Sequence, residues 1–322
     1  MIHGGNVWQG ASPDAWLDFS ANLRPEGPPS WVRAALGRAM GEVKFYPDLA
    51  MGAAREGIAA YAGVPAACVL PTAGGIEAID CVCRAGTGRV IVHPPTFGEY
   101  ARRAAACGRA LASGDAKKGD TVFLCNPNNP TGAALSRERV LEMARTSDAK
   151  LCVDEAFVDF CPEISVRERA AAGELVVVGS LTKALCVPGV RLGYLIAAPE
   201  AVKGYEKCAV PWSLNAFAAA IARELPGHLD KLDEDRKTNM LRREALAAAL
   251  RGLDADVFPS RTNFLLADFR RPMDAAAERL KAKGILVRTC ASFGLGDSFL
   301  RVAVKTEAEN ARLVRVLSEA IS

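Results

Sequence analysis

Four polar side chains of unlike chemistry follow apolar runs in the middle of this sequence. Lys183 comes after the run 174–179, Asp154 after 149–153 and Asn129 after 121–125, and Arg191 follows Lys183 by eight positions. A primary amine is a nucleophile towards carbonyl carbon, and a guanidinium clamps anions through its planar fork. The order and spacing of the amine, carboxylate, amide and guanidinium therefore predict one active site.

Each of these residues also has an ordinary interpretation when taken alone. The stretch NPNNPTG (126–132) could be only a turn, because Asn, Pro and Gly are turn formers. Asp154 could cap a helix, Lys183 could be solvated, and Arg191 could pair with any surface carboxylate. The site is therefore inferred from the four together.

The elements that must position these residues are short apolar runs alternating with helical patterns. Runs of strand type cover 89–94, 121–127, 149–157, 174–180 and 191–198, with helical stretches such as 136–147 between them. Strands that are apolar throughout are typical of a largely parallel sheet covered on both faces. Because ligands collect at the carboxyl ends of such strands, we expect the four side chains at one edge of the sheet.

Composition limits the class of protein. The 322 residues carry 24% charged side chains and a net charge of +3, with no long basic block, so we expect no nucleic-acid partner. No apolar run reaches the roughly 20 residues of a membrane span, and MIHGGNVWQG does not resemble a signal peptide. Ten cysteines within apolar runs indicate reduced thiols in a cytoplasmic protein. Cys81 and Cys83 lack zinc-ligand spacing, so no metal is expected.

Four motifs carry a family resemblance that covers nearly the whole chain. NPNNPTG, DEAF (154–157), SLTKALCVPGVRLGY (180–194) and FLRVAV (299–304) resemble the fold-type I aminotransferase superfamily, which uses pyridoxal 5′-phosphate. The resemblance implies an α/β fold with a mostly parallel seven-stranded sheet between helices and a smaller α+β domain. We expect an N-terminal segment at 1–40 that joins the small domain and the substrate pocket, a large cofactor-binding domain at 41–225 and a small domain at 226–322.

The resemblance assigns roles around the cofactor ring. Lys183 matches the lysine that condenses with the cofactor aldehyde, and Asp154 matches the carboxylate that keeps the ring nitrogen protonated, so that the ring accepts electrons. Asn129 matches the amide bound to the phenolic oxygen. Phe97, in PPTFGEY, matches the aromatic that stacks on the ring, although core packing would also explain it. Phe157 departs from many histidinol-phosphate aminotransferases, which have a tyrosine there.

The resemblance also implies a phosphate site made by hydroxyls, a guanidinium and the backbone of a helix N-terminus. Its members are Ser180, Thr182, Arg191, Gly74, Gly75 and Ile76. Many relatives place a hydroxyl or carboxyl side chain in the glycine turn, and this sequence does not. Tyr46, in KFYPD, resembles the tyrosine that reaches the phosphate in the neighbouring subunit, which implies a homodimer with shared sites.

Further stretches resemble the L-threonine-O-3-phosphate decarboxylases of cobalamin synthesis, close relatives of histidinol-phosphate aminotransferases. These are HGGN (3–6), LDFSANLRPEGPP (17–29) and TCASFGLGDSFLRV (289–302). The implied reaction is decarboxylation of L-threonine O-3-phosphate to (R)-1-amino-2-propanol O-2-phosphate. The alternatives are amino transfer on histidinol phosphate or a similar amine, decarboxylation of serine phosphate, and a ligand-sensing domain of a regulator.

A phosphorylated amino acid has two anionic ends and needs two cationic clamps. Arg301 matches the superfamily arginine for the α-carboxylate, and Arg288, on an adjacent predicted strand, is expected to meet the substrate phosphate. His3, Gly4, Asn22 and Asn129 are expected to complete the substrate site. Arg288 could instead be a surface residue, and His3 could belong to a frayed terminus.

Overall fold

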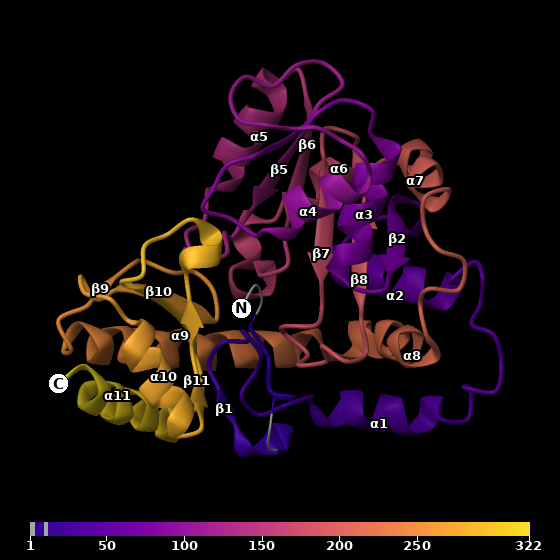
Figure 1. The fold of residues 1–322 in the computed structure, drawn as a ribbon. Coiled ribbons are helices and arrows are strands. Elements are labelled where there is room, and N and C mark those ends of the chain that lie inside the picture. Colours follow the sequence, from indigo (N-terminus) through magenta and orange to yellow (C-terminus); the bar gives the residue numbers. More distant parts are fainter. Residues whose placement is uncertain (1–3, 10–11) are drawn as a thin grey trace.

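The computed structural model describes residues 4–9 and 12–322. Its larger part is a seven-stranded sheet between helices, and its smaller part lies to one side (Figure 1). The large sheet has the order β2-β8-β7-β6-β5-β3-β4. Its strands are β2 (Val69–Thr72), β3 (Val90–Val92), β4 (Leu111–Ala112), β5 (Thr121–Cys125), β6 (Lys150–Asp154), β7 (Val176–Ser180) and β8 (Gly193–Ile196). Only β8 runs antiparallel to its neighbours, which confirms the predicted α/β class with a mostly parallel sheet.

Alternate residues of each buried strand point to the two faces of the large sheet, and each face has its own core. Val177 of β7 packs into one cluster, and Val176 and Val178 pack into the other. Helices α1 (Ser30–Ala39), α2 (Gly52–Ala62), α5 (Arg137–Thr146), α6 (Arg167–Ala171) and α8 (Ala216–Glu224) supply the first cluster. Helices α3 (Gly75–Ala85), α4 (Glu99–Ala106) and α7 (Pro199–Glu206) supply the second. Burial on both faces explains why these strands are apolar throughout.

The smaller part is built on a four-stranded antiparallel sheet with the order β12-β13-β10-β9. These strands are β9 (Asp256–Val257), β10 (Phe264–Asp268), β12 (Arg288–Thr289) and β13 (Phe299–Ala303), and α10 (Asp274–Ala282) and α11 (Glu307–Ile321) pack beside them. The N-terminal strand β1 (Leu17–Asp18) pairs with β11 (Ile285–Leu286), and Phe19 enters the small core. Val32 and Ala35 of α1 instead lie in the core of the large sheet.

Helix α9 (Leu229–Arg251) connects the two parts. It contacts the 3-10 turn η3 (Val158–Phe160) of the large domain and β9, β10 and α11 of the small domain. The other 3-10 turns are η1 (Pro13–Ala15), η2 (Ala66–Cys68), η4 (Pro162–Ile164), η5 (Leu225–His228) and η6 (Ala291–Phe293). The same long helix thus touches elements of both parts of the molecule.

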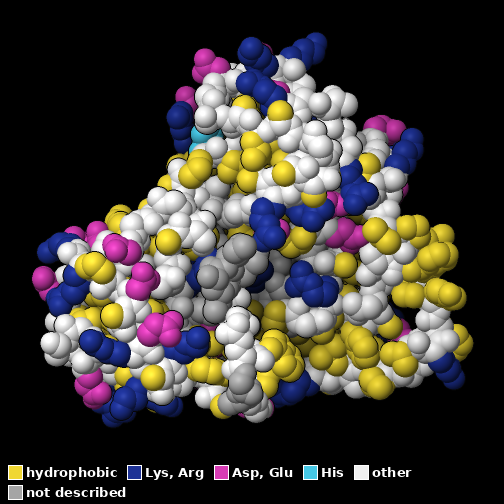
Figure 2. All heavy atoms as spheres, in the orientation of Figure 1, with side chains coloured by type: hydrophobic (Ala, Val, Ile, Leu, Met, Phe, Trp, Pro, Cys, Tyr) yellow, Lys and Arg dark blue, Asp and Glu magenta, His cyan; other side chains and the backbone are white. Residues whose placement is uncertain are grey.

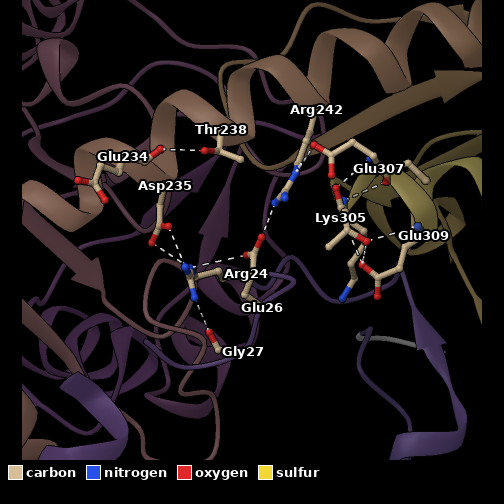
Figure 3. Close-up of polar contacts among 12 residues, drawn as sticks. Arg24, Glu26, Gly27, Glu234, Asp235, Thr238, Arg242, Lys305, Glu307 and Glu309 are labelled. Atoms are coloured by element: carbon tan, nitrogen blue, oxygen red, sulfur yellow. Dashed lines mark hydrogen bonds and ion pairs between the residues drawn. The ribbon is translucent and has the colours of Figure 1, made fainter. Parts of the chain in front are cut away.

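Ion pairs tie the N-terminal segment to α9 (Figure 3). Arg24 donates from Nε and Nη2 to the two carboxylate oxygens of Asp235, each at 2.8 Å. Arg242 donates to Glu26 at 2.5 Å and to Glu307, in the first turn of α11, at 3.0 Å. We call these five side chains the α9 ion-pair network.

Two further findings concern the chain as a whole. None of the helices in the described ranges is both long and apolar enough to cross a membrane. The ten cysteines are free thiols, and most of them are buried.

Candidate active site

Three neighbouring parallel strands bring the sequence-predicted residues to one edge of the large sheet. Asp154 is the last residue of β6, and it pairs in register with Cys125 at the end of β5 and with Val178 of β7. Asn129 follows β5 by four residues, and Lys183 follows the last residue of β7 by three. The carboxyl ends of β5, β6 and β7 therefore carry the amide, the carboxylate and the amine.

Lys183 lies half-buried at the centre of this group. Its Nζ donates to Thr182 Oγ1 at 3.1 Å and lies 5.9 Å from the centre of the Phe157 ring. Burial lowers the pKa of Lys183, and the charges of Arg191 and Arg301 lower it further, while Asp154 opposes the shift. A lowered pKa increases the fraction of neutral amine, which is the nucleophilic form.

Asp154 is nearly buried, at 4% exposure. Its Oδ2 accepts a hydrogen bond from the Tyr100 hydroxyl at 2.7 Å, and its Oδ1 accepts one from the Ala156 N–H at 2.9 Å. Burial raises the pKa of Asp154 although both hydrogen bonds and the Lys183 charge favour the ionised form. A buried carboxylate of this kind is stabilised by a cationic partner, which a protonated ring nitrogen would be.

The start of α3 and the residue Arg191 form an anion-binding corner. A Cβ placed on Gly74, the N-cap of α3, would lie 2.6 Å from Nη2 of Arg191, so glycine at this position leaves room for the guanidinium beside the helix start. Gly74 also has a positive φ of 82°. Arg191 is fixed by a 3.0 Å bond from Nη1 to the Pro188 carbonyl oxygen. The first N–H groups of α3, including those of Gly75 and Ile76, have no partner within the helix.

Two hydroxyls lie beside this corner. Ser180 Oγ and Thr182 Oγ1 are 2.8 Å apart, and a Cβ on Gly75 would lie 3.4 Å from the Ser180 Cβ. The helix start, the guanidinium and the two hydroxyls are the donors that a phosphate group needs. Together with Lys183 and Asp154, they fit both ends of pyridoxal 5′-phosphate.

Arg301 joins the N-terminal segment to the loop after β5. Its Nη1 donates to Asn129 Oδ1 and its Nη2 to the Ser20 carbonyl oxygen, both at 2.6 Å. Its Nε has no hydrogen-bond partner within 4–9 and 12–322. Burial lowers the pKa of Arg301 to about 10, so the guanidinium is still charged at neutral pH. A buried cation with an open donor is suited to an anionic ligand.

Arg288 lies directly across from Arg301 in the antiparallel pair of β12 and β13. It is 3% exposed, which excludes the surface-residue alternative, and its Nη2 donates to Ser292 Oγ at 2.5 Å. Both guanidinium groups lie near the Phe293 ring, at 5.2 Å for Arg288 and 5.8 Å for Arg301. Burial lowers the pKa of Arg288 as well. We call Arg288 and Arg301 the arginine pair.

The N-terminal segment approaches the arginine pair through Ser20. A Cβ on Gly4 would lie 2.1 Å from the Ser20 carbonyl oxygen, and the Gly5 N–H donates to Ser20 Oγ at 2.8 Å. Asn22 is buried, and its Oδ1 has no partner in the described part of the chain. Gly4 therefore lies beside Ser20, whose carbonyl oxygen accepts a hydrogen bond from Arg301. His3 lies outside the described residues.

Two predicted aromatic residues occupy different surroundings. Phe97 is half-buried and meets Tyr100 edge-on, with ring centres 5.6 Å apart. Tyr46 is 84% exposed, and its ring lies 5.3 Å from that of Trp212. Phe97 thus lies next to Tyr100, which donates the hydrogen bond to Asp154. Tyr46 lies at the surface of this chain.

Sequence reasoning missed Tyr100 and Ser20, which bind Asp154 and Arg301. Tyr100 follows Phe97 by three residues in the same motif, so helical spacing was the available signal. Ser20 acts partly through its backbone carbonyl, which no residue type reveals. Figure 2 shows Lys and Arg side chains gathered around a hollow between the two parts of the molecule.

Comparisons with known proteins agree with this geometry. The family "Aminotransferase class I and II" matches residues 14–317. The threonine-phosphate decarboxylase of Salmonella typhimurium is 32% identical, over 99% of this chain and 96% of that protein. The histidinol-phosphate aminotransferase of Aeromonas hydrophila is also 32% identical, over 96% and 92%.

Among solved structures, the L-threonine-O-3-phosphate decarboxylase of Porphyromonas gingivalis matches with a TM-score of 0.86 and 25% identity, covering 94% of this chain and 98% of that one. Relatives with two different reactions are thus equally similar in sequence, so family and cofactor follow from the comparisons while the reaction does not. The chain belongs to the class I and II aminotransferase family and uses pyridoxal 5′-phosphate.

Proposed function

We propose that this enzyme decarboxylates L-threonine O-3-phosphate to (R)-1-amino-2-propanol O-2-phosphate, for the aminopropanol arm of cobalamin synthesis. The arginine pair is the observation that carries the proposal. The similarity to threonine-phosphate decarboxylases supports it, as does a 27% identical relative named as a bifunctional protein of adenosylcobalamin biosynthesis.

The arginine pair suits a substrate with two anionic ends. The two guanidinium groups are cross-strand neighbours, and both are nearly buried. An anion bound to each would offset the free-energy cost of burying its charge. Arg301 already holds Asn129 and the N-terminal segment, so we assign it the α-carboxylate. We assign Arg288 to the substrate phosphate, with Gly4, Asn22 and His3 proposed to complete that end.

The residues of the chain divide the remaining work. When bound, pyridoxal 5′-phosphate supplies an electron-accepting ring for the electrons released at Cα. Lys183 would hold the cofactor through its Nζ, and the same amine, once free, would be placed to return a proton to Cα. Asp154 would hold the ring nitrogen in its protonated form. The arginine pair would hold the two anionic ends of the substrate and so determine which bond at Cα is presented for cleavage.

A direct assay separates this proposal from the runner-up, an aminotransferase acting on histidinol phosphate or a similar amine. The purified enzyme is given L-threonine O-3-phosphate alone, and CO2 release is measured. In parallel it is given histidinol phosphate with 2-oxoglutarate, and glutamate is measured. We expect CO2 in the first assay and little glutamate in the second; glutamate without CO2 would reject the proposal. L-Serine O-phosphate in the first assay tests how much the methyl group matters, since one methyl discriminates by only about 1–3 kcal/mol.

We further propose that the partner of this chain is a second copy of itself, with Tyr46 reaching the neighbouring cofactor phosphate. Exposed apolar side chains gather along 40–49 and 210–212, and Figure 2 shows hydrophobic surface at the right-hand edge, where these loops lie in Figure 1. The members are Met40, Val43, Phe45, Tyr46, Leu49, Val210 and Trp212. An apolar surface of this kind marks an interface.

The free thiols support a cytoplasmic location for the enzyme.

A further inference from the structure

Tyr100 is a buried phenol whose hydroxyl meets the functional carboxylate. It lies on α4 with no exposed surface, and its hydroxyl donates to Asp154 Oδ2 at 2.7 Å. The other oxygen of Asp154 is held by the Ala156 N–H. Each carboxylate oxygen therefore receives one donor from the protein, and each keeps a lone pair for a further donor.

The ring of Tyr100 is fixed by aromatic packing on two sides. It stacks on Phe123 of β5 with ring centres 4.9 Å apart and an angle of 4°, and Phe97 meets it edge-on at 5.6 Å and 84°. Phe97 is the residue predicted to stack on the cofactor ring. One side chain thus contacts the strand beneath the site, the proposed stacking residue and the carboxylate.

The protonation states of this pair are complementary. Burial, together with the nearby Asp154 charge, raises the pKa of Tyr100 well above its ordinary value, so the phenol remains a donor. Burial raises the pKa of Asp154, and the Tyr100 hydrogen bond is the strongest effect opposing that rise. Removing the hydroxyl would leave a more basic carboxylate in the same place.

We propose that Tyr100 is a positioning residue that keeps Asp154 ionised and aimed at the ring nitrogen of the cofactor. Without the hydroxyl, the carboxylate draws the shared proton away from the ring nitrogen, and the ring becomes a weaker electron acceptor. This inference concerns cofactor binding and holds for either reaction considered above.

The test is Tyr100→Phe, which keeps the ring stack and removes only the hydroxyl. The variant is loaded with ring-15N-labelled pyridoxal 5′-phosphate, and the nitrogen resonance is measured at fixed neutral pH. We expect the resonance to move towards that of the unprotonated ring. Because hydrogen bonds to charged groups are worth about 1.5–3 kcal/mol, the dissociation constant of the cofactor should rise roughly tenfold or more.

Tyr205→Phe is the matched control, since Tyr205 is a buried phenol in the same core cluster and its hydroxyl is contacted by Lys150 at 3.5 Å. The control should leave both readouts unchanged. Circular dichroism and the Tm of the cofactor-free protein separate misfolding from the proposed effect. A Tyr100→Phe protein that is less stable but has the wild-type resonance would show a merely structural role and overturn the proposal.

If Tyr100→Phe does not fold, 3-fluorotyrosine incorporated at position 100 replaces it. This phenol is more acidic and has nearly the same shape, so it is a stronger donor to Asp154. The nitrogen resonance should then move in the opposite direction, towards the fully protonated ring. An unchanged resonance with this residue would likewise overturn the proposal.

Discussion

At the scale of single residues, the pKa values of four buried charged groups of the site, Lys183, Asp154, Arg288 and Arg301, are shifted towards the neutral form. Burial is the main cause of the lowered pKa of Lys183 and Arg301 and of the raised pKa of Asp154. Such shifts are typical of sites that wait for a charged ligand. The cofactor and an anionic substrate supply the opposite charges, so their binding offsets the free-energy cost of burying these charged groups.

Asp154 is predicted to destabilise the cofactor-free protein at neutral pH. Because its folded-state pKa is raised, the stability that this group contributes is full at low pH and is lost as the pH rises through that pKa. Asp154→Asn mimics the protonated acid at every pH. The cofactor-free variant should therefore have a Tm a few degrees above wild type at neutral pH, with the gap closing in acid, while it loses turnover. Thermal unfolding across pH checks this, and a gap that widens in acid would contradict it.

Arg288 is predicted to distinguish phosphorylated from unphosphorylated substrates. Arg288→Ala should lower kcat/KM for L-threonine O-3-phosphate by roughly tenfold to a hundredfold, since about 1–3 kcal/mol is lost with a charge-assisted contact. Turnover of the unphosphorylated analogue should change much less. Arg270→Ala, an exposed arginine of the same domain, serves as control. Equal losses for both substrates would remove Arg288 from the phosphate role.

The sequence predicted those site residues whose type and motif carry the signal. Lys183, Asp154, Asn129 and Arg191 each stand in a quoted motif, and the structure brings them together at one sheet edge. Tyr100 and Ser20 could not be predicted in the same way, because their partners lie 54 and 281 positions away and depend on tertiary packing.

At the scale of elements, the N-terminal segment is held by contacts distant in sequence. β1 pairs with β11, and the α9 ion-pair network joins residues more than 200 positions apart. The large sheet could be predicted because its strands carry local apolar patterns. These long-range pairings could not, because a two-residue strand such as β1 has no pattern of its own.

The α9 ion-pair network is predicted to contribute modestly to stability and to be sensitive to salt. Arg24→Ala removes a bidentate pair with Asp235 and should cost about 1 kcal/mol in unfolding free energy, with the loss shrinking at high salt. Lys203→Ala, which removes an exposed pair with Glu200 within one helix, should cost less. Denaturant unfolding of both variants at low and high salt is the measurement. Equal costs for the two variants would contradict the prediction.

Acid should weaken the same network. Burial alone would raise the pKa of Glu26. The pKa is lowered instead, because three effects outweigh burial: the hydrogen bond and charge of Arg242, the hydrogen bond to the backbone N–H of Glu26 itself, and the charge of Arg24. A lowered folded-state pKa means that the contribution of Glu26 to stability is present above the unfolded pKa and is lost as the pH falls through the folded value. The network therefore holds at neutral pH.

At the scale of the whole molecule, the exposed apolar residues around Tyr46 and Trp212 underlie the proposed dimer. If each site takes Tyr46 from the other subunit, two inactive variants should complement each other. Lys183→Ala and Tyr46→Ala chains, unfolded together and refolded at equal amounts, should form mixed dimers with one intact site. Activity of roughly a quarter of wild type is expected in the mixture, as random pairing of subunits gives. Activity no greater than the sum of the separate variants would contradict the shared site.

The 23 residues of α9 have a consequence for movement. At about 1.5 Å per residue this helix is roughly 35 Å long, so a small tilt at one end would move the other end much further. A tilt of about 5° at its first turn, which meets the large domain, would carry its last turn and the attached sheet by about 3 Å. That displacement is about the length of one hydrogen bond, enough to separate Arg301 from Asn129. The α9 ion-pair network joins this helix to the N-terminal segment and to α11, so it opposes such a tilt.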